Sequence, residues 1–298
     1  MTMPELPEVE TTVLDLKAKV LERTFVDVWT DSKNLIKKPE SFEKFKKEIK
    51  GKKIKNIWRR GKNIIFELRQ TGVRPKLFLL IHQKMTGHLL LGKWKLERER
   101  WQAKNPGPLA EDPMNRFLHL IFWLNDGQML ALSDLRKFAK AELLDEKDLE
   151  KELSALGPEP LEKDFTFEKF RKCLAKKKKG KIKQVLMDQK VIAGIGNIYS
   201  DEILWEARVH PFKEIRQLDK EEMKKIYQAT KKILLKAVEL GGESISDYRK
   251  PSGEKGGFDP LRKVYRREGE KCSLCGVIIK RTKLAGRSAH FCPQCQKL

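Results

Sequence analysis

The chain has 298 residues, enough for two domains with a sizeable apolar core. Lysine and arginine number 64 against 42 acidic residues, so the formal net charge is +22. Such an excess destabilises a compact state by self-repulsion, which makes a polyanionic partner the best explanation. Nucleic acid is the leading candidate, ahead of a merely solvated charged surface and of an anionic membrane.

No apolar run approaches the roughly 20 residues of a membrane-spanning helix. Acidic residues close to the start, among them Glu5, Glu8 and Glu10, argue against an ordinary secretory signal. We therefore expect a cytoplasmic, reducing location and no membrane partner. In such a location the five cysteines serve as ligands or thiols rather than disulfides.

The first stretch, PELPEVE, predicts the start of a helix over residues 6–21. Pro7 suits the first turn, and early acids complement the positive end of the helix dipole. One apolar stripe follows at helical spacing, formed by Val9, Val13, Leu16 and Val20. Pro4 is either a helix-start residue or, if residues 1–3 are absent from the working protein, a free secondary amine.

From about residue 25 to 144 the apolar pattern has a period of two, with strand-like runs at 53–68, 76–91 and 117–144. The last run contains Asn125-Asp126-Gly127-Gln128, a hairpin signal. The polar, proline-containing stretch 92–115 is interpreted as a loop. We expect an α+β fold, whose first domain is an antiparallel β-sandwich with the N-terminal helix packed on it.

Beyond a linker at 156–166 the pattern turns helical. Asp219 and Glu222 form a capping box, and Gly241 ends that helix. The stretch 183–205 predicts two helices joined by a glycine-rich turn containing Gly194 and Gly196. The N-terminus of the second helix could bind a phosphate. After Gly241, a Gly-, Ser- and Lys-rich stretch predicts a mobile loop.

Two CxxC pairs stand near the end, and they supply four thiolates for one tetrahedral, structural Zn²⁺: Cys272, Cys275, Cys292 and Cys295. Such a site has no open position, so its role is to fold a hairpin too small to fold alone. Gly286-Arg287 between the pairs predicts an exposed tip, where the arginine either faces solvent or contacts a phosphate. Cys173 is left over as an ordinary thiol.

PELPEVE, HQKMTG at 82–87, DLRKF at 134–138, GIGNIY at 194–199 and the four-cysteine ribbon occur in this order along nearly the whole chain. Together they resemble the bacterial formamidopyrimidine-DNA glycosylases of the Fpg/endonuclease VIII family. The resemblance implies four parts: a catalytic β-sandwich domain (1–150), a helical helix-two-turns-helix DNA-binding domain (151–245), a mobile lesion-capping loop (246–261) and a zinc-finger domain (262–298).

The implied activity is that of a bifunctional DNA glycosylase and abasic-site lyase of base excision repair, acting as a monomer on double-stranded DNA at the bacterial nucleoid. It would remove oxidised purines such as 8-oxoguanine and formamidopyrimidines, and would also act on abasic sites. The proline nitrogen of this family attacks C1′ and forms a Schiff base, followed by β,δ-elimination. An α-amino group has a pKa of about 7.7–8.0 against about 10.4 for lysine, so more of it is unprotonated at neutral pH.

This chemistry requires a free nitrogen on Pro4, and we hypothesise that translation starts at Met3 and that this methionine is then removed. Glu5 resembles the family's general acid/base, and Glu8 matches a position that supports the site. Lys62 matches the lysine that contacts phosphate and assists elimination, and Arg287 is also assigned to the catalytic set.

Other matches are implied to bind DNA. Residues at positions that contact the phosphates flanking the flipped nucleotide are His82, Lys183, Asn197, Tyr265 and Arg287. Residues at positions that fill the gap left by the flipped base are Met85, Arg136 and Phe138. The family's Asp-Pro-Arg is Asp134-Leu135-Arg136 here, and the stretch 93–115 is an insertion relative to the family.

Two alternatives stay open. One is an endonuclease VIII-like glycosylase for oxidised pyrimidines, which would share the nucleophile. The other is a non-catalytic protein that binds damaged DNA, which would result if Pro4 is not N-terminal.

Overall fold

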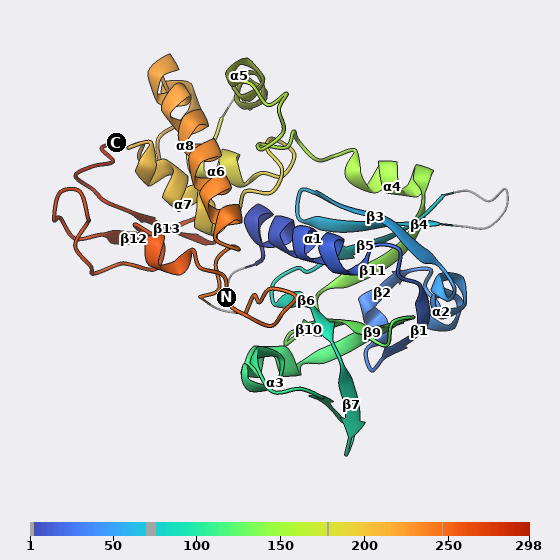
Figure 1. Ribbon diagram of the computed structural model, residues 1–298. Coiled ribbons are helices and arrows are strands. Elements are labelled where there is room, and N and C mark those ends of the chain that lie inside the picture. Colours follow the sequence, from blue (N-terminus) through green and yellow to red (C-terminus); the bar gives the residue numbers. More distant parts are fainter. Residues whose placement is uncertain (1–2, 70–75, 178, 246) are drawn as a thin grey trace. The chain divides into compact units, whose positions relative to one another are not determined.

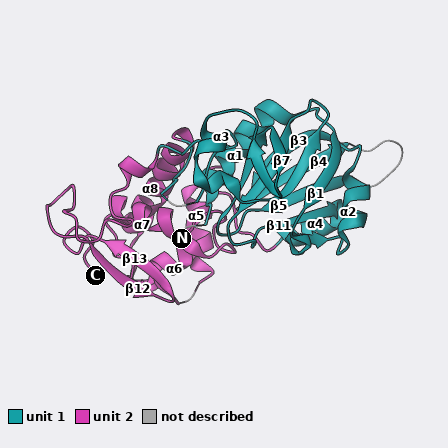
Figure 2. Ribbon diagram, turned by 90° about the horizontal axis from the view of Figure 1, so that it is seen from below, with its two compact units in different colours: residues 1–154, 241–257 teal, residues 155–240, 258–298 magenta. Residues whose placement is uncertain are grey.

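The computed structural model describes residues 3–69, 76–177, 179–245 and 247–298. The chain divides into two compact units (Figure 2): unit 1 comprises residues 1–154 and 241–257, and unit 2 comprises residues 155–240 and 258–298. Segment 241–257 therefore belongs with the N-terminal part of the chain. The four predicted domain boundaries stay predictions, as does the mobility of the loop.

Unit 1 contains two sheets that form a sandwich (Figure 1). The first has the order β1-β9-β10-β6, with bounds Phe25–Thr30, Leu118–Leu124, Met129–Asp134 and Gly87–Gly92. The second has the order β2-β11-β5-β4-β3, with bounds Ile36–Lys38, Lys140–Asp145, Leu77–His82, Asn63–Arg69 and Lys53–Arg60. All pairs are antiparallel except β2 with β11.

The core of unit 1 lies between these sheets and follows the period of two seen in the sequence. Alternate residues of β4 (Ile64, Phe66 and Leu68) and of β9 (Leu120, Phe122 and Leu124) belong to one buried cluster. The other faces of both sheets are also partly covered, which explains why several strands read as continuous apolar runs.

Helix α1 (Leu6–Val20) confirms the first prediction to within one residue. Its stripe Val9, Val13, Leu16 and Val20 is buried in the same cluster as the sandwich core. Other short elements of unit 1 are η1 (Lys33–Leu35), α2 (Phe42–Ile49) and α4 (Glu146–Leu153).

The interpretation of 92–115 as a loop is wrong. This stretch forms β7 (Trp94–Glu97), β8 (Arg100–Ala103), α3 (Pro108–Glu111) and η2 (Pro113–Arg116). Arg98 and Glu99 form the turn of the β7–β8 hairpin, with φ of 44° and 64°. Asn-Gly is the usual sequence of a turn with positive φ at both positions. Trp94 and Trp101 pack on the outer face of the first sheet. The many charged residues around them made the strand-like alternation of apolar and polar residues hard to recognise in the sequence.

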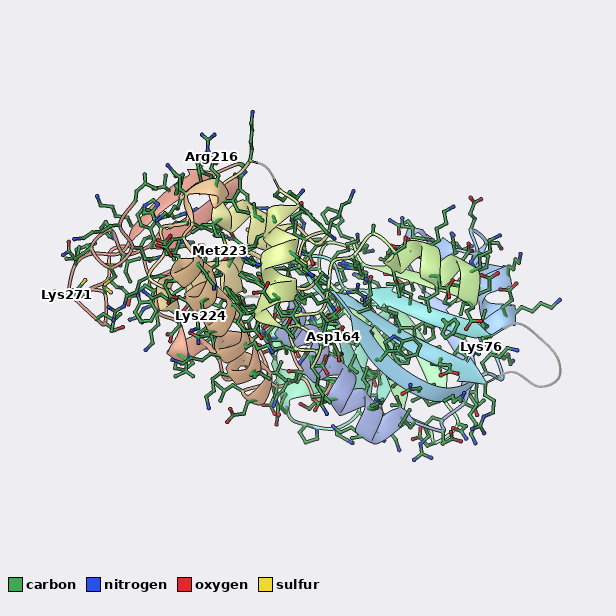
Figure 3. The ribbon with its side chains drawn as sticks, turned by 90° about the horizontal axis from the view of Figure 1, so that it is seen from above. Lys76, Asp164, Arg216, Met223, Lys224 and Lys271 are labelled. Carbon is green, nitrogen blue, oxygen red and sulfur yellow. The ribbon has the colours of Figure 1, made fainter. Side chains whose placement is uncertain are left out.

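Unit 2 contains α5 (Phe167–Ala175), α6 (Ile182–Met187), α7 (Asn197–Glu206), η3 (Ile215–Gln217), α8 (Lys220–Glu239), η4 (Asp259–Leu261), β12 (Lys280–Leu284) and β13 (Arg287–Phe291). The predicted capping box of α8 is present: the Glu222 N–H donates to Asp219 Oδ1 at 2.7 Å, and the Asp219 N–H to Glu222 Oε2 at 3.2 Å. Figure 3 shows nitrogen-tipped side chains around this unit, including the exposed Arg216 and Lys224. Within the described ranges, no helix has the length and apolar character of a membrane span.

Candidate active site

The first turn of α1 is buried and fixed by hydrogen bonds to its carboxylates. Pro4 and Glu5 are both buried, and the Glu5 N–H donates to Glu8 Oε2 at 2.8 Å. The second oxygen of Glu8, Oε1, accepts from the Glu243 N–H at 2.8 Å. Glu8 therefore ties the helix start to segment 241–257, which gives its predicted supporting role a physical basis. Residues 1 and 2, on which the start hypothesis depends, lie outside the described residues.

Gly242 lies against the same carboxylate. Its φ is +81°, and a Cβ placed there would lie 2.8 Å from Glu8 Oε1. Any larger residue would therefore push the segment away from the helix and strain the backbone. Because Gly242 has no side chain, the backbone after α8 comes close enough to Glu8 for the Glu243 N–H to donate to its carboxylate.

The hairpin turn that carries Lys62 is connected to α1 through Arg59. The Arg59 Nε lies 2.6 Å from Glu10 Oε2, and its Nη1 donates to the Gly61 carbonyl at 3.0 Å. Lys62 itself is buried, with an exposed fraction of 5%. No pattern in the sequence indicated the Arg59–Glu10 pair, which positions the lysine turn relative to the helix.

His82 ends β5 and lies between Asn63 on β4 and Lys140 on β11. Burial, together with the charges of Lys84, Lys62 and Lys140, lowers its pKa to about 3. The Lys84 N–H donates to His82 Nδ1 at 2.9 Å, so the neutral ring carries its proton on Nε2. The side chain thus offers one N–H donor, which is what a phosphate contact requires.

Three residues predicted to fill the gap left by the flipped base lie in contact with one another: Met85, Arg136 and Phe138. The guanidinium of Arg136 lies over the ring of Phe138, with 4.4 Å from Cζ to the ring centroid. Its Nη1 lies 3.4 Å from Met85 Sδ. Phe138 is 50% exposed, and an exposed phenylalanine held in place by a cation is unusual for a residue with only a packing role.

The buried Asp134 and Thr86 connect the two stretches that carry this trio, residues 82–87 and 134–138. Asp134 is fully buried; its Oδ2 accepts from the Ala139 N–H at 2.8 Å, and its Oδ1 accepts from the Thr86 hydroxyl. The Arg136 N–H donates to Thr86 Oγ1 at 3.1 Å. Sequence reasoning named neither residue as functional, although Asp134 stood inside the DLRKF motif.

In unit 2, Lys183 is buried rather than exposed. Its ammonium donates to Asp201 Oδ1 and, at 2.7 Å, to the Ser288 carbonyl. Asp201 Oδ2 accepts from the backbone N–H of His290 at 3.0 Å. Lys183 therefore joins α6, α7 and β13, and it also lines a pocket of about 200 Å³ together with Arg287.

The other predicted phosphate-binding residues of unit 2 lie on elements that meet α7. Asn197 is the first residue of α7, directly after Gly196. Tyr265 is buried, with its N–H donating to Glu202 Oε1 at 2.8 Å and its ring 4.9 Å from that of His290. Arg287 begins β13 after a turn in which Gly286 has φ +77°, and it is exposed. The predicted exposed tip is confirmed.

The four predicted cysteine ligands form one cluster, with all four sulfurs within 4.8 Å of one another: Cys272, Cys275, Cys292 and Cys295. Two sulfur pairs lie 3.4 and 3.9 Å apart. Tetrahedral zinc with Zn–S bonds of about 2.3 Å would separate its sulfurs by roughly 3.8 Å, so this donor set fits the ion. Figure 3 shows sulfur atoms in yellow near the labelled Lys271.

A two-sheet sandwich, a helical unit and a four-thiolate ribbon define a multidomain protein with a nucleic-acid-binding architecture. Family models match the chain in three places: the formamidopyrimidine-DNA glycosylase N-terminal domain at residues 3–141, the H2TH domain of the same glycosylase at 156–249, and the zinc finger found in FPG and IleRS at 269–298. The chain belongs to the formamidopyrimidine-DNA glycosylase family. The zinc-finger match and the cysteine cluster together make the ribbon a structural zinc site.

Relatives of the full length carry the same name. The formamidopyrimidine-DNA glycosylase of Bacillus cereus is 36% identical over 296 residues, covering 99% of each chain. That of Streptococcus thermophilus is 37% identical over 297 residues, covering 99% of this chain and all of the relative.

Solved structures of Lactococcus lactis Fpg superpose over 99% of this chain and 100% of theirs. A complex with DNA containing an abasic site has a TM-score of 0.83 at 35% identity. A complex with DNA containing N7-benzyl-Fapy-dG has a TM-score of 0.84 at 34% identity. A third complex, with DNA containing an oxidised pyrimidine, has a TM-score of 0.83 at 35% identity.

Proposed function

We propose that the protein is a bifunctional DNA glycosylase and abasic-site lyase of base excision repair, which removes oxidised purines such as 8-oxoguanine and formamidopyrimidines from double-stranded DNA. The observation that carries the proposal is the buried first turn of α1, where Pro4 and Glu5 stand next to each other under the Glu8 hydrogen bonds. The names and DNA ligands of the full-length relatives support it.

Pro4 is the nucleophile of this proposal. Its nitrogen forms a bond to C1′ of the damaged nucleotide, the bond from C1′ to the base breaks, and the base leaves. Opening of the deoxyribose ring then gives a cationic iminium, because proline is a secondary amine. The iminium withdraws electrons and acidifies the 2′ proton, so that the 3′ and then the 5′ phosphate leave by β- and δ-elimination.

The residues around Pro4 move protons and bind phosphate. Glu5 protonates the deoxyribose ring oxygen as the ring opens and later transfers protons during elimination. Lys62 contacts the phosphate beside the lesion and assists elimination. His82, neutral with its proton on Nε2, donates a hydrogen bond to a phosphate oxygen.

The trio Met85, Arg136 and Phe138, of which the last two are exposed, fills the gap left by the everted base. Extruding a base costs a few kcal/mol, and inserted side chains restore stacking and hydrogen bonds. Phe138 has the flat, half-exposed ring for stacking, and Arg136 beside it can donate to the orphaned cytosine. The predicted lesion-capping loop, residues 246–261, overlaps segment 241–257 and closes over the everted base.

Unit 2 binds the phosphates that flank the lesion. Asn197 at the start of α7, Tyr265 and the exposed Arg287 belong to this set. The contacts of Lys183 favour a role in holding the β12–β13 tip over the direct phosphate contact expected from its position in the motif. Zinc folds the ribbon and takes no part in the chemistry.

The working form, in this proposal, begins at Pro4, because an amide nitrogen cannot attack. The match to the N-terminal family model from residue 3 supports a start at Met3. The enzyme acts as a monomer in the bacterial cytoplasm, on the DNA of the nucleoid.

An oxidised-pyrimidine glycosylase is the second candidate, because one L. lactis Fpg complex contains such a lesion. The test uses one duplex with 8-oxoguanine opposite cytosine and another with thymine glycol opposite adenine, under single-turnover conditions with and without borohydride. We expect excision at least about tenfold faster from the first duplex. Faster excision from the second duplex would assign the pyrimidine specificity. Binding without excision or a trapped adduct would identify a non-catalytic binder.

A further inference from the structure

The insertion 93–115 contacts segment 241–257 through a paired and largely buried charge. Arg249 donates to both oxygens of Asp112, from Nε to Oδ2 at 2.6 Å and from Nη2 to Oδ1 at 3.2 Å. The two side chains are 5% and 15% exposed. Bidentate pairs of this kind fix orientation as well as distance, so the insertion determines where the backbone at Arg249 lies.

Burial alone would raise the pKa of Asp112, but hydrogen bonds from Arg249 and the Met114 N–H, with the Arg249 charge, keep it below its usual value. The carboxylate is therefore charged throughout the physiological range.

Asn115 makes a second, independent contact with the same segment. This residue is buried, and its Nδ2 donates to the Gly253 carbonyl at 3.0 Å and to the Pro108 carbonyl at 2.8 Å. Its Oδ1 lies 3.2 Å from His88 Nε2. Burial lowers the pKa of His88 to about 4, so the neutral ring donates to Asn115 and fixes the direction of the amide.

The backbone of the segment follows the insertion closely at Gly253. This glycine has φ +86°, and a Cβ there would lie 2.8 Å from Asn115 Nδ2 and 2.9 Å from the Leu109 nitrogen. The Leu91 N–H, at the end of β6, donates to the Pro251 carbonyl at 2.8 Å. Residues 249–253 therefore have one defined position on unit 1.

The other end of the segment contacts the catalytic helix. The Glu243 N–H donates to Glu8, as described above, and the Tyr248 hydroxyl lies 3.4 Å from that of Thr12. Segment 241–257 thus connects the first turns of α1 with the insertion. A displacement at Asp112 or Asn115 would be transmitted to residues that lie against the catalytic turn.

We propose that the insertion 93–115 positions segment 241–257 for recognition of the everted base, with Asp112 and Asn115 as positioning residues. The inference rests on the proposed function. If the insertion only stabilised the fold, its loss would affect all activities alike. In the positioning role, it affects the steps that involve a base and leaves the other steps unchanged. An abasic site has no base to recognise, so its cleavage reports on Pro4, Glu5 and the fold alone.

The experiment compares Asp112→Ala, Asp112→Asn and Asn115→Ala with a matched control, Glu99→Ala, which removes an exposed carboxylate from the hairpin tip of the same insertion. The full chain with its zinc is assayed for single-turnover excision of 8-oxoguanine and for cleavage of a preformed abasic site. We expect excision to fall about tenfold in the three variants, the size of one lost positioning interaction, and abasic-site cleavage to change less than about twofold. Glu99→Ala should change neither rate.

Equal losses of both activities in Asp112→Asn and Asn115→Ala, or no loss of either, would overturn the inference. Asp112→Asn retains the shape of the side chain, so it decides the matter even if the alanine variant fails to fold. Failure of the proposed function would look different, because the unaltered chain would then excise no 8-oxoguanine.

Discussion

The sandwich of unit 1 and the ribbon at residues 262–298 differ in what stabilises their folded structure. The sandwich has a continuous apolar interior contributed by both sheets and α1. The ribbon has almost none: four of the five residues of β12 are exposed, and its small cluster includes two of its own zinc ligands, Cys272 and Cys292. Unit 1 contains the buried first turn of α1 with Pro4 and Glu5, whereas the exposed Arg287 belongs to the part that depends on a metal.

The sharpest way to test this difference is to remove the zinc. Structural zinc contributes on the order of 10–16 kcal/mol to the folding of small domains, far more than the ribbon's apolar cluster can supply. Cys292→Ser should therefore unfold the ribbon and weaken binding to an abasic-site duplex by more than about 100-fold, because several phosphate contacts are lost. Fluorescence anisotropy measures the binding, and near-UV circular dichroism should still report a folded sandwich.

Cys173→Ser is the matched control, since this buried thiol lies outside the cluster. It should retain one zinc per chain and full affinity. Full affinity in Cys292→Ser would show that the ribbon folds without the metal.

A second test addresses the apolar core with a pair of phenylalanines. Phe122 is fully buried between the sheets, so Phe122→Ala should lower the free energy of unfolding of unit 1 by about 3–5 kcal/mol. Phe138 is half exposed, so Phe138→Ala should change it by less than about 0.5 kcal/mol while slowing base excision. Urea titrations measure both. Similar losses of stability would mean that Phe138 has a packing role after all.

A third test uses pH. In the folded state burial lowers the pKa of His82 to about 3 and that of His88 to about 4, against about 6.5 when unfolded. As the pH falls below about 6.5 the unfolded chain binds protons first, so unit 1 loses up to about 1.4 kcal/mol per pH unit for each histidine. The loss continues down to the folded pKa. Urea unfolding at pH 7 and pH 5 measures it, and His88→Gln should make the dependence shallower. An unchanged slope would contradict the assignment.

The smallest expected effect concerns Arg136. Arg136→Ala should reduce the preference for cytosine opposite the lesion by roughly tenfold, because one base contact is lost. Arg116→Ala is a suitable control, since Arg116 also lies over a phenylalanine ring, 5.1 Å from the centroid of Phe117, but outside the trio. Excision opposite cytosine and opposite adenine gives the ratio. An unchanged ratio in Arg136→Ala would remove the arginine from opposite-base recognition.

What could be predicted from the sequence was local or carried by chemically distinctive motifs. The stripe of α1, the Asp219 capping box and the cysteine pairs each depend on spacing within one segment. Three contacts were missed because the two partners lie in different elements, and ordinary polar or charged residues give no sign of burial in the sequence. They are Asp112 with Arg249, Arg59 with Glu10, and Asp134 with Thr86. The β7–β8 hairpin was missed because Arg98 and Glu99 adopt a turn conformation that their residue types do not favour.

Locating the covalent bond is the decisive test of whether the Pro4 nitrogen bonds to C1′. The protein, expressed from Met3, is reacted with a duplex containing 8-oxoguanine, reduced with borohydride, digested and mapped by mass spectrometry. We expect a reduced sugar adduct on the N-terminal peptide beginning at Pro4, and none in Pro4→Gly beyond a trace. An adduct on the peptide containing Lys62, or active protein that still carries Met3 before Pro4, would contradict it.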